Sequence, residues 1–152
     1  ASMPQSQLNG LAYLTAIKNG EIDSSAMSDI IPMRLTVVRE SYVEYEVRPD
    51  QRHFNLQGGI HGGFCATVLD SATGAAVHTT VDSGVSFSTI DLNVKMIKAM
   101  KSGETYTAIG EVIRSGRNVL TSEGRIIDQD GKIYAFGSAT LLVTHRGLTS
   151  ST

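Results

Sequence analysis

The fold is decided by a glycine-rich segment that leads directly into an apolar helix: Gly58-Gly59-Ile60-His61-Gly62-Gly63, followed by Phe64-Cys65-Ala66-Thr67-Val68-Leu69-Asp70-Ser71-Ala72-Thr73-Gly74-Ala75-Ala76-Val77. When the second part is placed on a helix of 3.6 residues per turn, small or apolar side chains lie on almost every side. A helix with so little polar surface is normally buried. We therefore expect one long central helix over about residues 61–80, with small side chains that let a sheet approach closely.

Segments with the alternating pattern of β-strands lie on both sides of this helix. Before it, residues 34–39 and 41–48 are rich in Val, Tyr and Thr and alternate apolar with polar side chains. After it, the alternation returns in four further segments, which cover residues 86–97, 104–114, 118–128 and 132–144. The last two are joined by Asp130-Gly131, a strong hairpin signal. The sequence therefore predicts an α+β protein with an antiparallel sheet around a central helix.

The remaining residues form a lead-in and a tail. Apolar residues at helical spacing predict a helix between residues 8 and 17, which Asn19-Gly20 would end. We expect residues 1–29 to be this helix and a polar linker, residues 30–146 to form a single domain, and residues 147–152 to be a short polar tail. A sheet wrapped around one helix leaves strand edges and one face uncovered, so we also expect a homo-oligomer.

Composition narrows the classes of function. The 152 residues carry a formal net charge of -2, so no overall basic field points to nucleic acid. The single cysteine, Cys65, excludes an intramolecular disulfide and fits a reducing compartment. No apolar stretch approaches the roughly 20 residues that span a bilayer, and the first residues show no signal-peptide core. These features predict a cytoplasmic protein that binds neither nucleic acid nor membrane.

The outstanding polar feature is Asp70, an acid on the most apolar helix. If the helix begins near Gly62, Asp70 lies a little over two turns in, and Ala66 shares its face. We expect the apolar helix to bury this carboxylate. Burying an unpaired carboxylate is costly, so such residues are usually paired, hydrogen-bonded or functional. Position alone leaves two interpretations open: a functional carboxylate, or an acid that caps a neighbouring loop or faces solvent.

The glycine-rich segment before the helix is suited to binding negative charge. Glycines let a ligand approach the backbone N–H groups closely, and the N-terminus of the helix adds roughly half a positive charge. Such a site suits an anion or the oxyanion that develops during acyl transfer. The alternative is a tight turn between strand and helix, because glycines alone are a weak signal.

Other chemistries receive less support from the sequence. His61 and Cys65 are four residues apart, but a lone cysteine in an apolar run is more often a small buried hydrophobe than a nucleophile. Arg117, beside Gly116 in a turn, could meet a phosphate group or could be a solvated strand end. We expect no metal site, because the histidines are not at metal-ligand spacing. They are His53, His61, His78 and His145.

Taken together, these pieces resemble a known family. Asn55, the run His61-Gly62-Gly63 and Asp70 are similar to the signature of the PaaI-type thioesterases, which are named for phenylacetic acid degradation and include thioesterase superfamily member 2. Asp70 stands fifteen residues after Asn55 and nine after His61, and the resemblance extends over residues 30–145. It implies the hotdog fold, in which an antiparallel sheet wraps around one long helix. It also implies hydrolysis of acyl- or aryl-CoA thioesters, with no cofactor other than the CoA of the substrate.

The resemblance implies a role for each matching residue around the scissile bond. Asp70 would be the catalytic carboxylate, acting as general base on water or as nucleophile. The backbone N–H of Gly62 would be the oxyanion donor, and Asn55 would hold the thioester carbonyl. Apart from the resemblance, the N-terminus of the helix disfavours a protonated His61, so we expect His61 to be a hydrogen-bond anchor rather than an acid.

Two further regions receive a role from the same resemblance. Ser88 matches a hydroxyl that orients the attacking water, and the adjacent Thr89 is the alternative. Gly116 and Arg117 match the region that receives the nucleotide of CoA.

The resemblance also implies an assembly in which Asn55 and Gly62 come from one subunit and Asp70 from the other. A dimer would then form the active sites, and we expect a tetramer of two such dimers. Two other functions stay open. One is a hydratase or dehydratase that acts on acyl-CoA or acyl carrier protein through His61 and Asp70, and the other is a non-enzymatic acyl-CoA binding module. The identity of the acyl group is not readable from the sequence.

Overall fold

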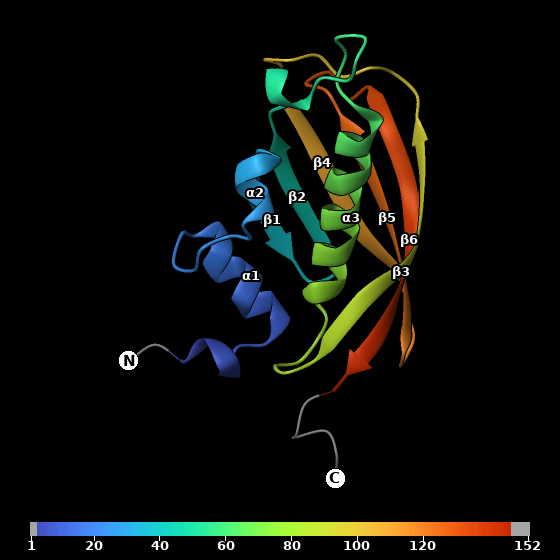
Figure 1. Cartoon of the computed structure of the whole chain (residues 1–152). Coiled ribbons are helices and arrows are strands. Elements are labelled where there is room, and N and C mark those ends of the chain that lie inside the picture. The colour runs from blue at the N-terminus through green and yellow to red at the C-terminus, as the bar shows by residue number, and fades with distance from the viewer. Residues whose placement is uncertain (1–2, 147–152) are drawn as a thin grey trace.

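Helix α3 (Gly62–His78) lies across one face of a six-stranded antiparallel sheet in the computed structural model, which describes residues 3–146 (Figure 1). The order of strands across the sheet is β1-β2-β4-β5-β6-β3. Their bounds are β1 (Met33–Arg39), β2 (Tyr42–Val47), β3 (Ser86–Met96), β4 (Tyr106–Ser115), β5 (Val119–Ile127) and β6 (Ile133–His145). The predicted α+β class and central helix are confirmed, and no predicted strand end is wrong by more than two residues.

Close packing between α3 and the sheet depends on small residues on both sides. A side chain at Gly110 of β4 would overlap the backbone of Ala72, so only glycine permits this approach. His61 caps the helix, because its Nδ1 accepts a hydrogen bond of 2.8 Å from the Gly63 N–H. The helix therefore begins at a fixed residue and lies directly on the middle strands.

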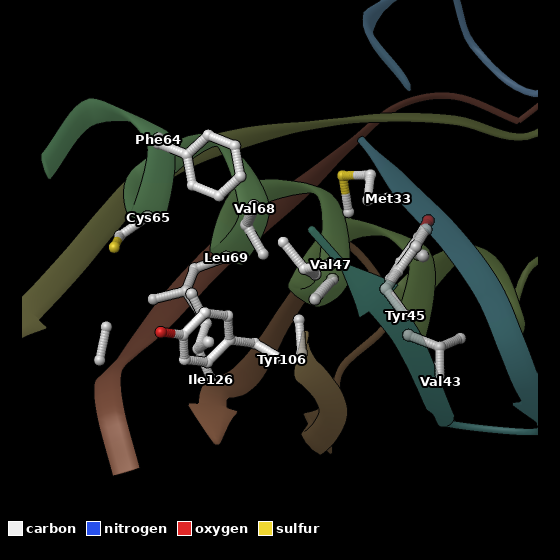
Figure 2. Close-up of a cluster of buried hydrophobic side chains, with 14 of the residues drawn as sticks. Met33, Val43, Tyr45, Val47, Phe64, Cys65, Val68, Leu69, Tyr106 and Ile126 are labelled. Atoms are coloured by element: carbon white, nitrogen blue, oxygen red, sulfur yellow. The ribbon is translucent and has the colours of Figure 1, made fainter. Parts of the chain in front are cut away.

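The core fills the space between α3 and the concave face of the sheet (Figure 2). Val68 and Leu69 from the helix meet Ile126 of β5 and the ring of Tyr106, and all four side chains are fully or almost fully buried. The hydroxyl of Tyr106 stays satisfied because it accepts a hydrogen bond of 2.8 Å from the Lys101 N–H. This packing buries one side of α3 and leaves the opposite side for a site.

The N-terminal segment lies beside α3, over the β1 end of the sheet (Figure 1). The predicted first helix is α1 (Gly10–Lys18), capped by Asn9, whose side chain accepts from the Ala12 N–H at 2.9 Å. An unpredicted single-turn helix, α2 (Met27–Ile30), spans the predicted end of the polar linker at residue 29. The sequence did not indicate it because four residues are too few to give a helical period. Two short 3-10 helices complete the elements, η1 (Gln5–Gln7) and η2 (Gln51–His53).

Two sequence-based expectations concern the ends of the chain and its hydropathy. The polar tail expected over residues 147–152 lies outside the described residues. Within residues 3–146, every helix is too short or too polar to cross a bilayer.

Candidate active site

Asp70 lies on the exposed face of α3, where its Oδ1 accepts a hydrogen bond of 2.9 Å from the Thr89 hydroxyl on β3. The expectation of a carboxylate buried by an apolar helix is therefore wrong for the single chain. The reason is that composition does not separate the two faces of α3. The large apolar side chains point toward the sheet, while the outer face carries Asp70 among small residues such as Gly74.

A cleft of about 490 Å³ runs from Asp70 and Thr89 to the N-terminal segment. Its walls come from α1, the linker and α2, from β1 and β2, and from the outer face of α3 and the start of β3. The volume falls within the usual range of small-molecule sites. Asp70 is thus exposed, but it faces a lined cavity rather than open solvent.

Thr89, and not Ser88, contacts the carboxylate. Neighbouring residues of a strand point to opposite faces of the sheet, and Thr89 lines the cleft together with Phe87, which leaves Ser88 exposed on the other face. If the alternation of Leu92 and Val94 continued without interruption toward the N-terminus of β3, Ser88 would lie on the inner face of the sheet. A β-bulge between Thr89 and Asp91 shifts the alternation by one residue, so Thr89 lies on the inner face instead.

The segment before α3 is held by its own polar groups. Oδ1 of Asn55 accepts from the Gln57 N–H at 2.9 Å and from the Gly59 N–H at 3.1 Å. The Asn55 N–H donates in turn to the Gly59 carbonyl at 2.8 Å. Among the hydrogen bonds of residues 3–146, none uses the Gly62 N–H. The tip of α3 therefore presents one unused donor, and the loop before it holds the Asn55 side chain in a fixed orientation.

His53 is a residue of this region that sequence reasoning missed. It is buried, and its Nδ1 accepts from the Asp50 N–H at 3.0 Å while its Nε2 lies 2.6 Å from the Ile30 carbonyl oxygen. The Nε2–H tautomer satisfies both bonds. Its backbone carbonyl accepts from the His61 N–H at 2.8 Å. His53 thus connects α2 to the start of α3, and scattered histidines in a sequence give no signal for such a role.

Asp50 and Arg52 form an ion pair at the N-terminal side of the loop that carries Asn55. The guanidinium of Arg52 donates to both carboxylate oxygens of Asp50, at 2.9 and 2.8 Å. These side-chain hydrogen bonds hold the pKa of Asp50 well below its usual range. The N-terminal side of this loop is therefore held by the Asp50–Arg52 ion pair and by the hydrogen bonds of the His53 ring.

Within one chain, the structure does not bring the tip of α3 to Asp70. Eight residues separate Gly62 from Asp70 on one helix, which corresponds to about 12 Å along its axis. The Gly62 N–H points away from Asp70, so an acceptor lies about 3 Å farther still. His61 is one residue more distant, so it cannot form a catalytic pair with Asp70 inside the same chain.

The turn with Gly116 and Arg117 lies three strands away from Thr89 at the same end of the sheet. Thr89 pairs with Leu141, which pairs with Leu120, whose other neighbour is Ser115. Three strand spacings correspond to on the order of 14 Å. The Gly116 N–H donates to the Val119 carbonyl at 3.0 Å, and the exposed Arg117 accepts from Arg146 through its backbone carbonyl.

Cys65 is part of the core rather than of the site. Its Sγ lies 3.5 Å from the Sδ of Met100, and burial raises the pKa of the thiol. A thiol in such surroundings is a poor nucleophile, in agreement with the prediction against a cysteine–histidine pair. In the part of the chain that the structure describes, no group of three His, Cys, Asp or Glu side chains is placed to hold a metal ion.

Burial changes the titration of two groups that line the cleft. It lowers the pKa of the His78 imidazole below its ordinary value of 6.5 and raises the pKa of Tyr45 to about 12. Both side chains therefore favour the neutral form at physiological pH. The carboxylates that line the cleft are those of Asp70 and Asp23.

The chain resembles known proteins in sequence. The model of the thioesterase superfamily matches residues 57–135. A provisionally named esterase of Caenorhabditis elegans is 30% identical over 115 residues, which are 74% of this chain and 65% of that protein. Acyl-coenzyme A thioesterase 13 of Mus musculus is 26% identical over 96 residues, which are 62% of this chain and 68% of that protein. The chain thus spans about two thirds of the length of these relatives.

The fold is also found among solved structures. A provisionally named thioesterase of Ralstonia eutropha, a phenylacetic acid degradation-related protein, superposes with a TM-score of 0.78 and 27% identity over 86% of this chain and 99% of that chain. The PaaI protein of Escherichia coli gives a TM-score of 0.77 and 18% identity over 90% and 96% of the two chains. These matches confirm the predicted hotdog fold. The family model of the thioesterase superfamily covers more than half of the sequence, so the chain belongs to that superfamily.

Proposed function

We propose that the protein is an acyl-CoA thioesterase, which hydrolyses an acyl- or aryl-CoA thioester to the free acid and CoA. The observation that carries this proposal is the Asp70 carboxylate, oriented by Thr89 at one end of a cleft, in a chain of this superfamily. A thioester carbonyl is more electrophilic than that of an ester. A positioned base and an oxyanion donor can therefore suffice, without a full catalytic triad.

In the proposed reaction, Asp70 acts as general base on water. Its Oδ1 is engaged by Thr89, so Oδ2 remains to accept a proton from the attacking water. The water oxygen forms a bond to the carbonyl carbon, and the carbonyl electrons move onto the oxygen. Collapse of this oxyanion breaks the carbon–sulfur bond, and the thiolate of CoA leaves and takes the proton back from Asp70. Direct attack by Asp70 is the alternative route.

The oxyanion would be held by the Gly62 N–H and by Asn55 of a second copy of the chain. A water that bridges Oδ2 and the carbonyl carbon keeps the carboxylate and the oxyanion within about 7 Å of each other. The separation along one α3 exceeds this limit by several ångströms. A site that uses both groups therefore needs two chains. The described sheet ends in two edge strands, β1 and β3, and we take the β3 edge for this association because β3 carries Thr89, the partner of Asp70.

Two finer parts of the proposal concern CoA and the assembly. Arg117 is exposed in a tight turn, where its guanidinium can meet the phosphates of CoA. Pairing of two dimers into a tetramer would cover the remaining outer face of the sheets. Size measurement by light scattering, with and without CoA, tests both the number of subunits and its dependence on ligand.

Release of free thiol from a panel of acyl-CoAs tests the proposed function. We expect thiol release by the wild-type protein and no hydration of enoyl-CoA, and the reverse result would establish a hydratase instead. Binding of acyl-CoA without thiol release would establish a binding module. One turnover in heavy-oxygen water distinguishes the two routes, because direct attack by Asp70 leaves the label out of the first acid released.

A mixture of two inactive variants tests the two-chain site. Asp70→Asn and Asn55→Ala chains, mixed equally and reassociated, should regain up to about a quarter of wild-type activity, because half of the dimers then contain one intact site. If the two residues act within one chain, the mixture stays inactive.

A further inference from the structure

Gly74 occupies the middle of α3, one turn after Asp70 on the same face, and lines the cleft. Glycine in a helix interior is destabilising by roughly 0.5–1 kcal/mol relative to alanine. Here a Cβ atom would meet nothing within 4 Å. At Gly110 and Gly124, by contrast, a Cβ would press against α3. No contact within the described chain requires the glycine at position 74.

We propose that the space over Gly74 holds the acyl group of the substrate and that Gly74 limits the acyl groups that fit. This inference rests on the proposed function, because it takes Asp70 as the group that faces the thioester carbon. An acyl group that begins at Asp70 and follows the outer face of α3 reaches Gly74 after one helical turn, about 6 Å. An absent side chain at that point leaves the path open.

The walls along this path determine its chemical character. Leu14, Met33 and Leu35 are buried apolar residues that line the cleft. They present apolar surface to an acyl group, and removing such surface from water favours binding. The path therefore offers apolar surface to a hydrocarbon or aryl group, while the same cleft is also lined by the hydroxyl groups of Ser24, Ser25, Ser28 and Ser71.

Three rings form the end of the path. His78 follows Gly74 by one further turn, stacks on Tyr13 of α1 at 5.5 Å between centroids, and meets Phe87 of β3 edge-on at 5.4 Å. All three residues line the cleft. Because Tyr13 belongs to the N-terminal segment, that segment supplies part of the wall that limits the length of the acyl group.

The charges of the cleft select against an acidic acyl group. Asp23 and Asp70 line it, whereas no Lys or Arg does so among the described residues. A carboxylate at the far end of an acyl group would meet like charge and find no cation. The proposed substrate class is therefore a CoA thioester of a neutral, apolar acid, and half-thioesters of dicarboxylic acids are disfavoured.

Substitution of Gly74 by Ala and Leu tests this path, with acetyl-CoA and octanoyl-CoA as probes. We expect Gly74→Leu to lower kcat/KM for octanoyl-CoA on the order of 10²-fold while acetyl-CoA changes little, because the acetyl group ends before position 74. Gly74→Ala should give a smaller loss, and neither substitution should lower the Tm. An unchanged ratio of the two rates in Gly74→Leu overturns the inference, as does a loss of stability or a new oligomeric state, which would mean that a partner chain fills the space.

A second variant works in the opposite direction. Tyr13→Ala opens the end of the path and should raise the rate with long acyl groups relative to octanoyl-CoA. Leu11→Ala is the matched control, because it truncates a residue of the same helix that does not line the cleft. If both variants have the same acyl-length profile as the wild type, the ring cluster does not limit the path.

The pair butanoyl-CoA and succinyl-CoA tests the charge selection at equal chain length. We expect the neutral thioester to be preferred on the order of 10-fold or more, and equal rates overturn this part of the inference. Absence of thiol release from every acyl-CoA would overturn the proposed function, whereas thiol release with an unchanged profile in all variants would overturn only the acyl path.

Discussion

The tip and the middle of helix α3 are built in opposite ways. At the tip, Asn55 and His61 are engaged by backbone N–H groups, and the buried His53 ties the loop to Ile30. In the middle, Asp70 has one side-chain partner, Thr89, and otherwise faces a cleft. The first region is fixed by its own hydrogen bonds, and the second is left open.

This difference fits the two tasks that thioester hydrolysis requires. Oxyanion donors act well when they are oriented before the reaction, because no reorganisation is then needed as charge develops. An acyl site must instead leave volume free for a ligand. The comparison predicts that substitutions at the tip change catalysis through geometry, while substitutions in the middle change either the chemistry at Asp70 or the selection of substrate.

Asp70→Asn should have the largest effect, because it removes the proposed base with almost no change in shape. We expect kcat to fall by about 10²–10⁴-fold, the usual contribution of a general base, while the thermal unfolding midpoint stays near that of the wild type. Steady-state thiol release and a thermal melt measure the two quantities. Asp82→Asn, which changes an exposed acid after α3, is the control, and equal effects of the two variants would contradict the role of Asp70.

Two substitutions of Asn55 separate its structural contribution from its proposed contact with the substrate. Asn55→Asp keeps the acceptor for the Gln57 and Gly59 N–H groups but loses the amide donor. We expect kcat/KM to fall on the order of 10–10²-fold with little change in stability. Asn55→Ala loses both and should also unfold more easily, by about 1–2 kcal/mol. If Asn55→Asp retains full activity, the tip acts only through its shape.

At the tip, the sequence was sufficient to place Asn55 near the start of the helix because they are close together in the chain, but it carried no signal for His53, whose ring contacts the distant Ile30. Asn55 and the His61-Gly62-Gly63 run form a local pattern, and the strand alternation and the apolar helix are local as well. The cleft combines distant segments, so Tyr13 and Phe87 could not be assigned to one wall before folding. The exposure of Asp70 was predicted wrongly, because composition alone does not say which side of a helix meets the sheet.

Thr89 illustrates a second limit on prediction. A one-residue shift in a strand exchanges its two faces, and the bulge in β3 produces such a shift. Thr89→Val should therefore lower kcat on the order of 10-fold, because the Asp70 carboxylate loses the hydroxyl that orients it. Ser88→Ala, on the opposite face, should leave the rate nearly unchanged. A larger loss in Ser88→Ala than in Thr89→Val would restore Ser88 to the site.

The smallest expected effect concerns His78 and the pH dependence of stability. Burial lowers its pKa in the folded protein below the ordinary value of 6.5, so the unfolded chain binds the proton more readily. The contribution of neutral His78 to stability is therefore complete above about pH 6.5 and is lost as the pH falls through the folded pKa. Asp70, Asp23, Tyr13 and Tyr45 are the other titratable groups that line the cleft.

His78→Phe keeps a ring against Tyr13 and Phe87 but removes the titration. Chemical denaturation at pH 7 and pH 5 should show a smaller loss of stability on acidification in this variant than in the wild type. His145→Asn, at the exposed end of β6, should keep the wild-type dependence. Because this ring closes the proposed acyl path, the same measurement with a bound non-hydrolysable acyl-CoA sharpens the comparison. A ligand that covers His78 should increase the loss of stability that the wild type shows between pH 7 and pH 5. A ligand held only at the tip of α3 should leave this loss unchanged.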